Sequence, residues 1–211
     1  MLPPPTLTLH PALPSDIPLL AHIYRLAFSP GKLYTSLFSA CSPTEIELKM
    51  GKRFAKWIAD PKSEVLKAVN AEDEIVGFAF WDLPEPLEGW PKEAEEEGPR
   101  KLREFSEGTR VEVARDFFAR LDAHEETLPK RSFHLQMIAT DPRHQRTGAA
   151  RLLIEQLAVE ADREGVEVHL DATEEGLPVY PRFGYDAVGD PIVANDGSFE
   201  VQAMKAQPPS S

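Results

Sequence analysis

The stretch "IATDPRHQRTGAARLL", residues 138–153, joins two segments of different periodicity and decides the fold. Before the turn, residues 131–140 are mostly apolar and alternate in the way typical of a strand. After it, residues 147–165 repeat apolar side chains at helical spacing and close on a glycine, a common helix stop. Residues 166–172 then alternate again. Strand, helix and strand in this order predict a βαβ unit whose two strands run parallel.

The turn between this strand and this helix, residues 141–150, suits an anionic ligand. A helix N-terminus offers unpaired amides and the positive end of the helix dipole. Gly148 allows the backbone to curve closely around a ligand, and Arg143 and Arg146 add positive charge. A turn that needs glycine only for its shape is the alternative interpretation.

Two common phosphate-binding loops do not fit this turn. A Walker loop ends in Gly-Lys-Ser/Thr, whereas Gly148 is followed by alanine. A Rossmann fingerprint has three glycines at fixed spacing, and this turn holds only Gly148. The composition of the turn therefore excludes both of these nucleotide sites.

The rest of the chain predicts one domain, residues 6–205, between two short tails, residues 1–5 and 206–211. A length of 211 residues favours a single domain with at most an elaboration. Outside the βαβ unit we expect a strand at residues 6–12, two helices at 14–28 and 42–58, and an antiparallel pair of strands at 63–69 and 74–83. After a long excursion at 84–107 we expect a helix at 110–124, a short helix at 174–183 and a last strand at 199–204.

Capping residues mark the starts of the first two helices. Ser15 or Asp16 is expected to cap the first helix. Ser42 and Glu45 have the spacing of a capping box, with Pro43 at the first helical position of the second helix.

Charge and composition bound the function. The net charge is −12. Non-specific electrostatic binding of nucleic acid needs clustered Lys and Arg, so we expect no nucleic-acid partner. We find no apolar run of about 18 residues and expect no membrane span. The six histidines lack metal-ligand spacing, so no metal is expected. The single cysteine, Cys41, cannot form an internal disulfide, which favours a reducing setting, cytoplasmic or nuclear, and we expect the cytoplasm.

Two motifs carry a resemblance to a known family. "LQMIATDPRHQRTGAARLLIEQL" resembles the acyl-coenzyme A motif of the GNAT N-acetyltransferase superfamily, whose pattern Gln/Arg-x-x-Gly-x-Gly/Ala is matched by Gln145, Gly148 and Ala150. "LPVYPRFGYD" resembles a second segment of that family, with Tyr180 and Gly184 matching and a tyrosine in place of the usual phenylalanine. Within this family, the sequence of the first motif is most similar to the fungal small-molecule-type members.

The resemblance implies an α/β (α+β) GNAT fold. Its expected core is a mixed, mostly antiparallel twisted sheet of six or seven strands, with helices on both faces and one parallel pair splayed at the acyl-CoA site. It implies transfer of an acetyl group from acetyl-CoA directly to a primary amine of a small molecule. A non-catalytic acyl-CoA-binding or sensing module and a protein N-acetyltransferase are the alternatives. A monomer and a homodimer both fit the family.

The resemblance also implies site residues. Tyr180 is expected to protonate the departing thiolate, and the amide of Ile138 to polarise the thioester carbonyl. The backbone of the strand end and of the turn is expected to hold the pantetheine arm and the pyrophosphate, through Ile138, Ala139, Thr140, Gln145, Arg146, Thr147, Gly148, Ala149 and Ala150.

The catalytic base is left open by the sequence. His134 titrates near neutrality and shares a strand face with Gln136, opposite Phe133, Leu135 and Met137. It is one candidate, and a purely structural histidine is the alternative. Other candidates are carboxylates expected near strand ends, namely Asp82, Asp171, Glu174 and Glu175.

The excursion at residues 84–107 is rich in Pro, Gly and Glu. Long loops inside compact domains are usually functional or disordered. Its acidic run, residues 93–97, is interpreted as a solvated face. The alternative hypothesis is that the excursion, with Trp81 and Trp90 nearby, forms a wall over the acceptor site and attracts a cationic amine.

Overall fold

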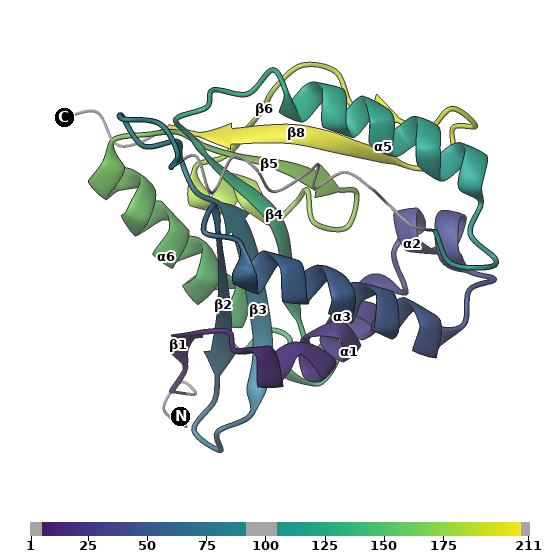
Figure 1. The fold of residues 1–211 in the computed structure, drawn as a ribbon, viewed down its shortest axis with the longest axis horizontal. Coiled ribbons are helices and arrows are strands. Elements are labelled where there is room, and N and C mark those ends of the chain that lie inside the picture. The colour runs from purple at the N-terminus through teal and green to yellow at the C-terminus, as the bar shows by residue number, and fades with distance from the viewer. Residues whose placement is uncertain (1–5, 92–104, 208–211) are drawn as a thin grey trace.

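The computed structural model of the protein describes residues 6–91 and 105–207. Its described part folds around one sheet of eight strands in the order β1-β2-β3-β4-β5-β8-β6, with β7 also paired to β8 (Figure 1). The strands are β1 (Thr8–Pro11), β2 (Ser63–Val69), β3 (Ile75–Asp82), β4 (Phe133–Thr140), β5 (Val168–Thr173), β6 (Asp186–Ala187), β7 (Ile192–Val193) and β8 (Glu200–Ala206).

The pairing of these strands confirms the predicted fold class. β4 and β5 run parallel, as the βαβ pattern predicts, and every other pair in the sheet is antiparallel. The strand count exceeds the expected six or seven, because β6 and β7 are two residues long. Segments that short leave no alternation in a sequence from which they could be predicted.

The helices are α1 (Ile17–Phe28), α2 (Lys32–Phe38), α3 (Pro43–Ala59), α5 (Val111–Glu125) and α6 (Ala149–Glu164), with 3₁₀ turns η1 (Pro14–Asp16), η2 (Pro142–His144) and η3 (Tyr180–Phe183). The sequence prediction missed α2, and the short helix expected at residues 174–183 is reduced to turns followed by η3. Among the described helices, none has the length and apolarity needed to cross a membrane.

Two layers of helices cover opposite faces of the sheet. On one face α6 buries Leu153 and Leu157 against a core that includes Phe133 and Leu135 of β4. On the other face α1 and α3 cover β2, β3 and β4 with a second core (Figure 1). Both cores are apolar along β3, which explains why its sequence is hydrophobic on both sides.

Helix α5 runs alongside β8 and covers the C-terminal half of the sheet (Figure 1). It packs there through Phe117, whose ring centroid is 4.7 Å from that of Phe199. This packing brings its last turn towards β4 and β5. Trp81, which the sequence placed near the hypothetical wall over the acceptor, is fully buried in the core under α6 and cannot contribute to such a wall.

A bulge interrupts β4 at its centre. Trp81 pairs with Leu135 and Phe80 pairs with Met137, which leaves Gln136 as the extra residue. The bulge reverses the alternation beyond it. Met137 therefore packs against the α1 and α3 core and not, as the alternation predicted, beside Phe133 and Leu135.

Two of the predicted helix caps do not form. Ser42 precedes α3 without a side-chain capping bond, and Glu45 instead accepts a hydrogen bond from the amide of Glu107 at 3.2 Å. Asp16 precedes α1 without a capping bond, because its carboxylate accepts from the Leu13 amide at 2.7 Å. The capping box was therefore a wrong prediction, although its proline does start α3.

Candidate functional site

The centre of the sheet opens into a wedge between β4 and β5. The two strands pair from Phe133 and Val168 to Leu135 and Leu170, and the pairing then stops. Beyond that point β4 pairs only with β3 and β5 only with β8, within the described residues. The edge of β4 that faces β5 is therefore unpaired over residues 136–140, as expected for a splayed parallel pair.

The hydrogen bonds of β4 tell which amides face this wedge. The amide of Asp141 donates to the carbonyl of Val76 at 2.9 Å, on the β3 side. Successive amides of a strand point to opposite edges. The amides of Thr140 and Ile138 therefore point away from β3, into the wedge. They do so because the bulge at Gln136 shifts the alternation by one residue.

A cluster of free amides lies at the start of α6. Gly148 precedes the helix with φ 99°, and Arg146 also has a positive φ, 63°. Over the described parts of the chain, the amides of residues 146–150 have no hydrogen-bond acceptor. Amides left free by a left-handed turn and a helix start form a concave donor site for anions. Among the described residues beyond its chain neighbours and the backbone of α6, only Leu7 comes within 4 Å of a Cβ built on Gly148, so this side of the turn is open.

One cleft, of about 2440 Å³, connects the donor turn with the wedge. It is larger than the roughly 300–1,000 Å³ typical of small-molecule pockets and suits an extended ligand. Most of the residues singled out in the sequence line it: His134, Ile138, Ala139, Thr140, Gln145, Arg146, Gly148, Ala149, Ala150 and Tyr180.

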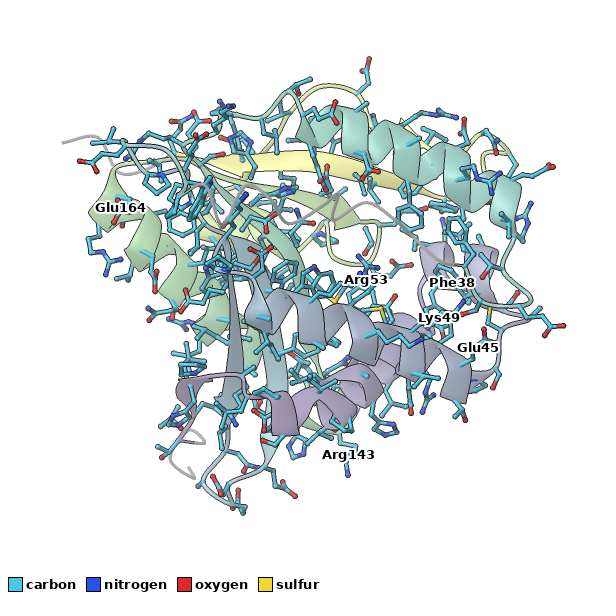
Figure 2. All side chains as sticks on the ribbon, viewed as in Figure 1. Phe38, Glu45, Lys49, Arg53, Arg143 and Glu164 are labelled. Carbon is cyan, nitrogen blue, oxygen red and sulfur yellow. The ribbon has the colours of Figure 1, made fainter. Side chains whose placement is uncertain are left out.

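Two residues of the predicted turn do not contribute side chains to the cleft. The hydroxyl of Thr147 donates to the carbonyl of His144 at 2.7 Å. Arg143 forms an ion pair with Asp141 at 2.7 Å and lies far from Lys49 and Arg53, which line the cleft from α3 (Figure 2). Its charge is thus neutralised locally, so the expected contribution of Arg143 to an anion site is wrong.

Tyr180 begins η3 and lines the cleft. Its side chain is buried, and its ring packs edge-on against Tyr185 with centroids 5.7 Å apart. Burial raises the pKa of Tyr180 to about 12. The phenol therefore keeps its proton across the neutral and mildly alkaline range, and it can donate that proton.

A polar cluster lies at the other end of the wedge, on the sheet face opposite α6. The cluster consists of Glu125 of α5, His134 of β4 and Asp171 of β5. One carboxylate oxygen of each acid and one ring nitrogen of the histidine all lie within 4.8 Å of one another. The Nε2 atom of His134 is 3.4 Å from Oδ2 of Asp171. The side-chain Nε2 of Gln136 donates to Oδ2 of Asp82 at 2.8 Å and lies 3.0 Å from Nδ1 of His134.

The electrostatics of this cluster oppose a basic role for His134. Burial by itself lowers the pKa of His134, but the hydrogen bond to Asp171 and the charges of Glu125 and Asp82 outweigh it and raise the pKa. Burial raises the pKa of Glu125, although the nearby His134 acts in the other direction. The surrounding carboxylates thus favour the protonated imidazole, and Glu125 is the carboxylate of the cluster whose proton affinity is raised.

Glu125 was missed in the sequence. It lies at the end of α5, the helix that follows the excursion, and no local pattern indicates that the last turn of α5 lies at the centre of the sheet.

Two other carboxylates that were singled out have structural partners. Glu175 accepts from the amide of Lys32 at 2.8 Å, and Glu174 forms an ion pair with the Lys32 ammonium, so both hold α2.

The excursion is described only at its ends. Residues 92–104 lie outside the described residues, and so does the acidic run that was hypothesised to attract an amine. Trp90 lies beside Lys62, whose ammonium is 5.9 Å from the centre of the indole ring. The expected role of this segment over the acceptor site stays a prediction.

The family model described as acetyltransferase (GNAT) domain matches residues 118–206. The match runs from within α5 to the end of β8. It includes the wedge, the donor turn, Tyr180 and the polar cluster. A search of curated proteins finds no match for the sequence.

Solved structures of acetyltransferases share the fold over nearly the whole chain. A histone acetyltransferase HPA2 and related acetyltransferase from Corynebacterium glutamicum is 22% identical, with a TM-score of 0.63 over 99% of this chain and 98% of that chain. PaiA N-acetyltransferase from Thermoplasma acidophilum, solved in complex with coenzyme A, is 12% identical, with a TM-score of 0.58 over 96% and 99%.

A third similar structure is that of an enzyme whose substrate is a protein. The ribosomal-protein-S18-alanine N-acetyltransferase of Escherichia coli is 15% identical, with a TM-score of 0.54 over 98% of this chain and 96% of that chain. At these identities the likeness shows the fold alone, and the family model covers less than half of the chain. Together they support an acyltransferase with the GNAT fold, whose residues 118–206 match the GNAT acetyltransferase domain.

Proposed function

We propose that the protein transfers an acetyl group from acetyl-CoA directly to the primary amine of a small molecule. The observation that carries this proposal is the shared cleft. In it the unpaired edge of β4, the free amides at the start of α6 and the buried phenol of Tyr180 face one space.

Coenzyme A would bind along the backbone. The pyrophosphate would accept hydrogen bonds from the amides of residues 146–150, with Gln145 beside it, while Ala149 and Ala150 are small enough to let it approach. The pantetheine arm would add to the free edge of β4 at Ile138, Ala139 and Thr140, as an extended chain adds to a sheet. Thr147 would take part through its amide alone.

The chemistry would take place in the wedge. The amide of Ile138 points to the place where the thioester carbonyl would lie, and a donor aimed at a developing oxyanion is worth a few kcal/mol. Tyr180 would protonate the thiolate as it leaves. Its raised pKa of about 12 keeps the proton available at neutral pH.

The acceptor end favours a slender amine. The Asp171 side chain is only 10% exposed, and side chains of α5 such as Leu121 and Glu125 line the cleft above it. A small amine or a single extended chain end can reach that depth, whereas a folded protein surface cannot. We expect the reaction to take place in the cytoplasm, with the protein as a monomer or a homodimer.

Thiol release tests the proposal. Purified protein would be given acetyl-CoA with butylamine, 1,4-diaminobutane, phenethylamine or a short peptide with a free N-terminus. We expect thiol release that depends on one of the small amines. Tight acetyl-CoA binding by calorimetry with no turnover on any acceptor would favour a non-catalytic binding or sensing module. Turnover on the peptide alone would favour a protein N-acetyltransferase.

A further inference from the structure

We propose that Glu125 and Asp171 together receive the ammonium group of the acceptor, and that Glu125 takes its proton. This inference rests on the proposed function and extends it to the acceptor side of the same cleft. Glu125 enters from α5, outside the βαβ unit that holds the donor turn, and the sequence did not single it out.

The first support is that both carboxylates have unused acceptor capacity. Within the described residues, the Glu125 side chain makes no hydrogen bond and no ion pair, and it faces the cleft. Oδ1 of Asp171 is inaccessible to solvent and has no hydrogen-bond partner, on a side chain that is nine-tenths buried. The imidazole of His124 also lies near that oxygen, with its Nε2 3.9 Å away. A buried carboxylate oxygen without a donor is costly, and a turn of the Asp171 side chain that brought this oxygen to an ammonium group would satisfy it.

The second support is the sign of the local charge. Within the cluster, His134 is the cation, and it already contacts Asp171 through Oδ2. Three acidic groups act on Glu125, namely Asp82, Asp122 and Asp171, so negative groups outnumber His134 around it. The titratable groups that act on Glu125 and its partners come from β3, β4, β5 and α5 itself, namely Asp82, His134, Asp171, Asp122 and His124. A cationic ligand is therefore favoured in this space.

The third support is the position of the cluster relative to the wedge. Asp171 is the first residue of β5 beyond the last β4–β5 pair, so it lies where the two strands separate. Its side chain and that of His134 lie on the face opposite α6, whereas the free amide of Ile138 lies in the plane of the sheet. An amine that enters from the α5 side would meet the thioester between the strands.

The proton balance of the step is complete with these groups. The bound ammonium gives one proton to the Glu125 carboxylate, and the neutral amine forms a C–N bond with the thioester carbon. The C–S bond then breaks, and the thiolate takes a proton from Tyr180. The nitrogen loses its second proton as the amide forms, and this proton restores the phenol. Glu125 releases its proton to the solvent, so one proton leaves per turnover.

The test uses the full chain and compares Glu125→Gln with Glu112→Gln. Glu112 lies in the first turn of the same helix, is exposed, and does not line the cleft. We expect Glu125→Gln to lower kcat/KM for the accepted amine by at least roughly 100-fold, the range of a positioned general base. Acetyl-CoA affinity, measured by calorimetry, should be unchanged and also reports that the variant is folded. Glu112→Gln should behave as the wild type.

The pH profile adds a readout that a structural role would not move. In the wild type, kcat/KM should fall on the acid side as Glu125 becomes protonated. This limb should disappear in Glu125→Gln and return, at lower activity, in Glu125→Asp. A wild-type kcat/KM and an unchanged acid limb in Glu125→Gln would overturn the inference while leaving the proposed function intact.

Binding without turnover and metal binding are tested separately. Titration of butylammonium into the CoA complex, followed by the imidazole NMR signals of His134, should show binding in the wild type and weaker binding in Asp171→Asn. Equal binding in both would overturn the inference even if no amine is acetylated. Dialysis against EDTA should leave turnover unchanged. Loss of turnover that is restored by Zn²⁺ would instead make the cluster a metal site and overturn the inference.

Discussion

The two ends of the cleft are built in different ways. The donor end consists of backbone amides, freed by a left-handed turn at Gly148 and by the unpaired edge of β4. The acceptor end consists of side chains, brought together from α5, β4 and β5. Backbone donors serve any phosphate or carbonyl, whereas a set of side chains is specific for charge and shape. The contrast suggests that the donor end determines the co-substrate and the acceptor end determines the amine.

The largest expected effect comes from closing the donor end. Gly148→Trp should weaken acetyl-CoA binding by at least roughly 100-fold, because even two lost hydrogen bonds to a charged group cost about 3 kcal/mol. Calorimetry with acetyl-CoA measures this directly. Gly165→Trp is the matched control, since Gly165 also has a left-handed φ, 65°, and open surroundings but lies at the far end of α6. If both variants kept full affinity, the donor site would lie elsewhere.

A second change separates chemistry from binding. Tyr180→Phe should lower kcat by about 100-fold, as expected for loss of a general acid, with little change in acetyl-CoA affinity. Steady-state kinetics and calorimetry on the same preparation give both values. Tyr185→Phe is the control, because Tyr185 packs against Tyr180 but does not line the cleft. A wild-type kcat in Tyr180→Phe would remove this phenol from the mechanism.

A smaller effect distinguishes His134 from Glu125 as the base. The charge of His134 lowers the pKa of Glu125, so in His134→Asn that pKa should rise further. The acid limb of kcat/KM should therefore start at a higher pH, with the value at the optimum reduced by roughly tenfold or less. Disappearance of the limb in His134→Asn would show that the histidine itself takes the proton.

The smallest expected effect is an absence of change at alkaline pH. The raised pKa of Tyr180, about 12, means that the phenol is still protonated at pH 10. The usual pKa of tyrosine is about 10, and the raised pKa moves the loss of the Tyr180 proton to higher pH. Loss of this proton should therefore cause no decline in kcat at saturating amine between pH 8 and pH 10. A decline centred near pH 10 would contradict this environment for Tyr180.

The same contrast explains what the sequence could predict. The turn at residues 141–150 lies within one continuous segment, so its glycine, its helix start and its flanking strands are visible together. The free amide of Ile138 was expected only by resemblance, and the bulge at Gln136 that orients it changed the face of Met137. Bulges depend on pairing with another strand, which a single segment does not reveal.

The acceptor end was harder to predict for a related reason. His134 and Asp171 were both singled out, but they are 37 residues apart in the chain, and their contact depends on the strand pairing that places Val168 beside Phe133. Glu125 depends in addition on the tertiary packing of α5 through Phe117 and Phe199. Its raised pKa follows from burial that no sequence pattern records.

The most direct test of the central claim is a product assay. Wild-type protein, acetyl-CoA and a small amine would be incubated together, and both free coenzyme A and the N-acetylated amine would be measured by mass spectrometry. Acetyl transfer through this cleft predicts equal amounts of the two products, with both lost together in Gly148→Trp and retained in Gly165→Trp. Coenzyme A release without the acetylated amine, or product formation that Gly148→Trp leaves unchanged, would contradict it.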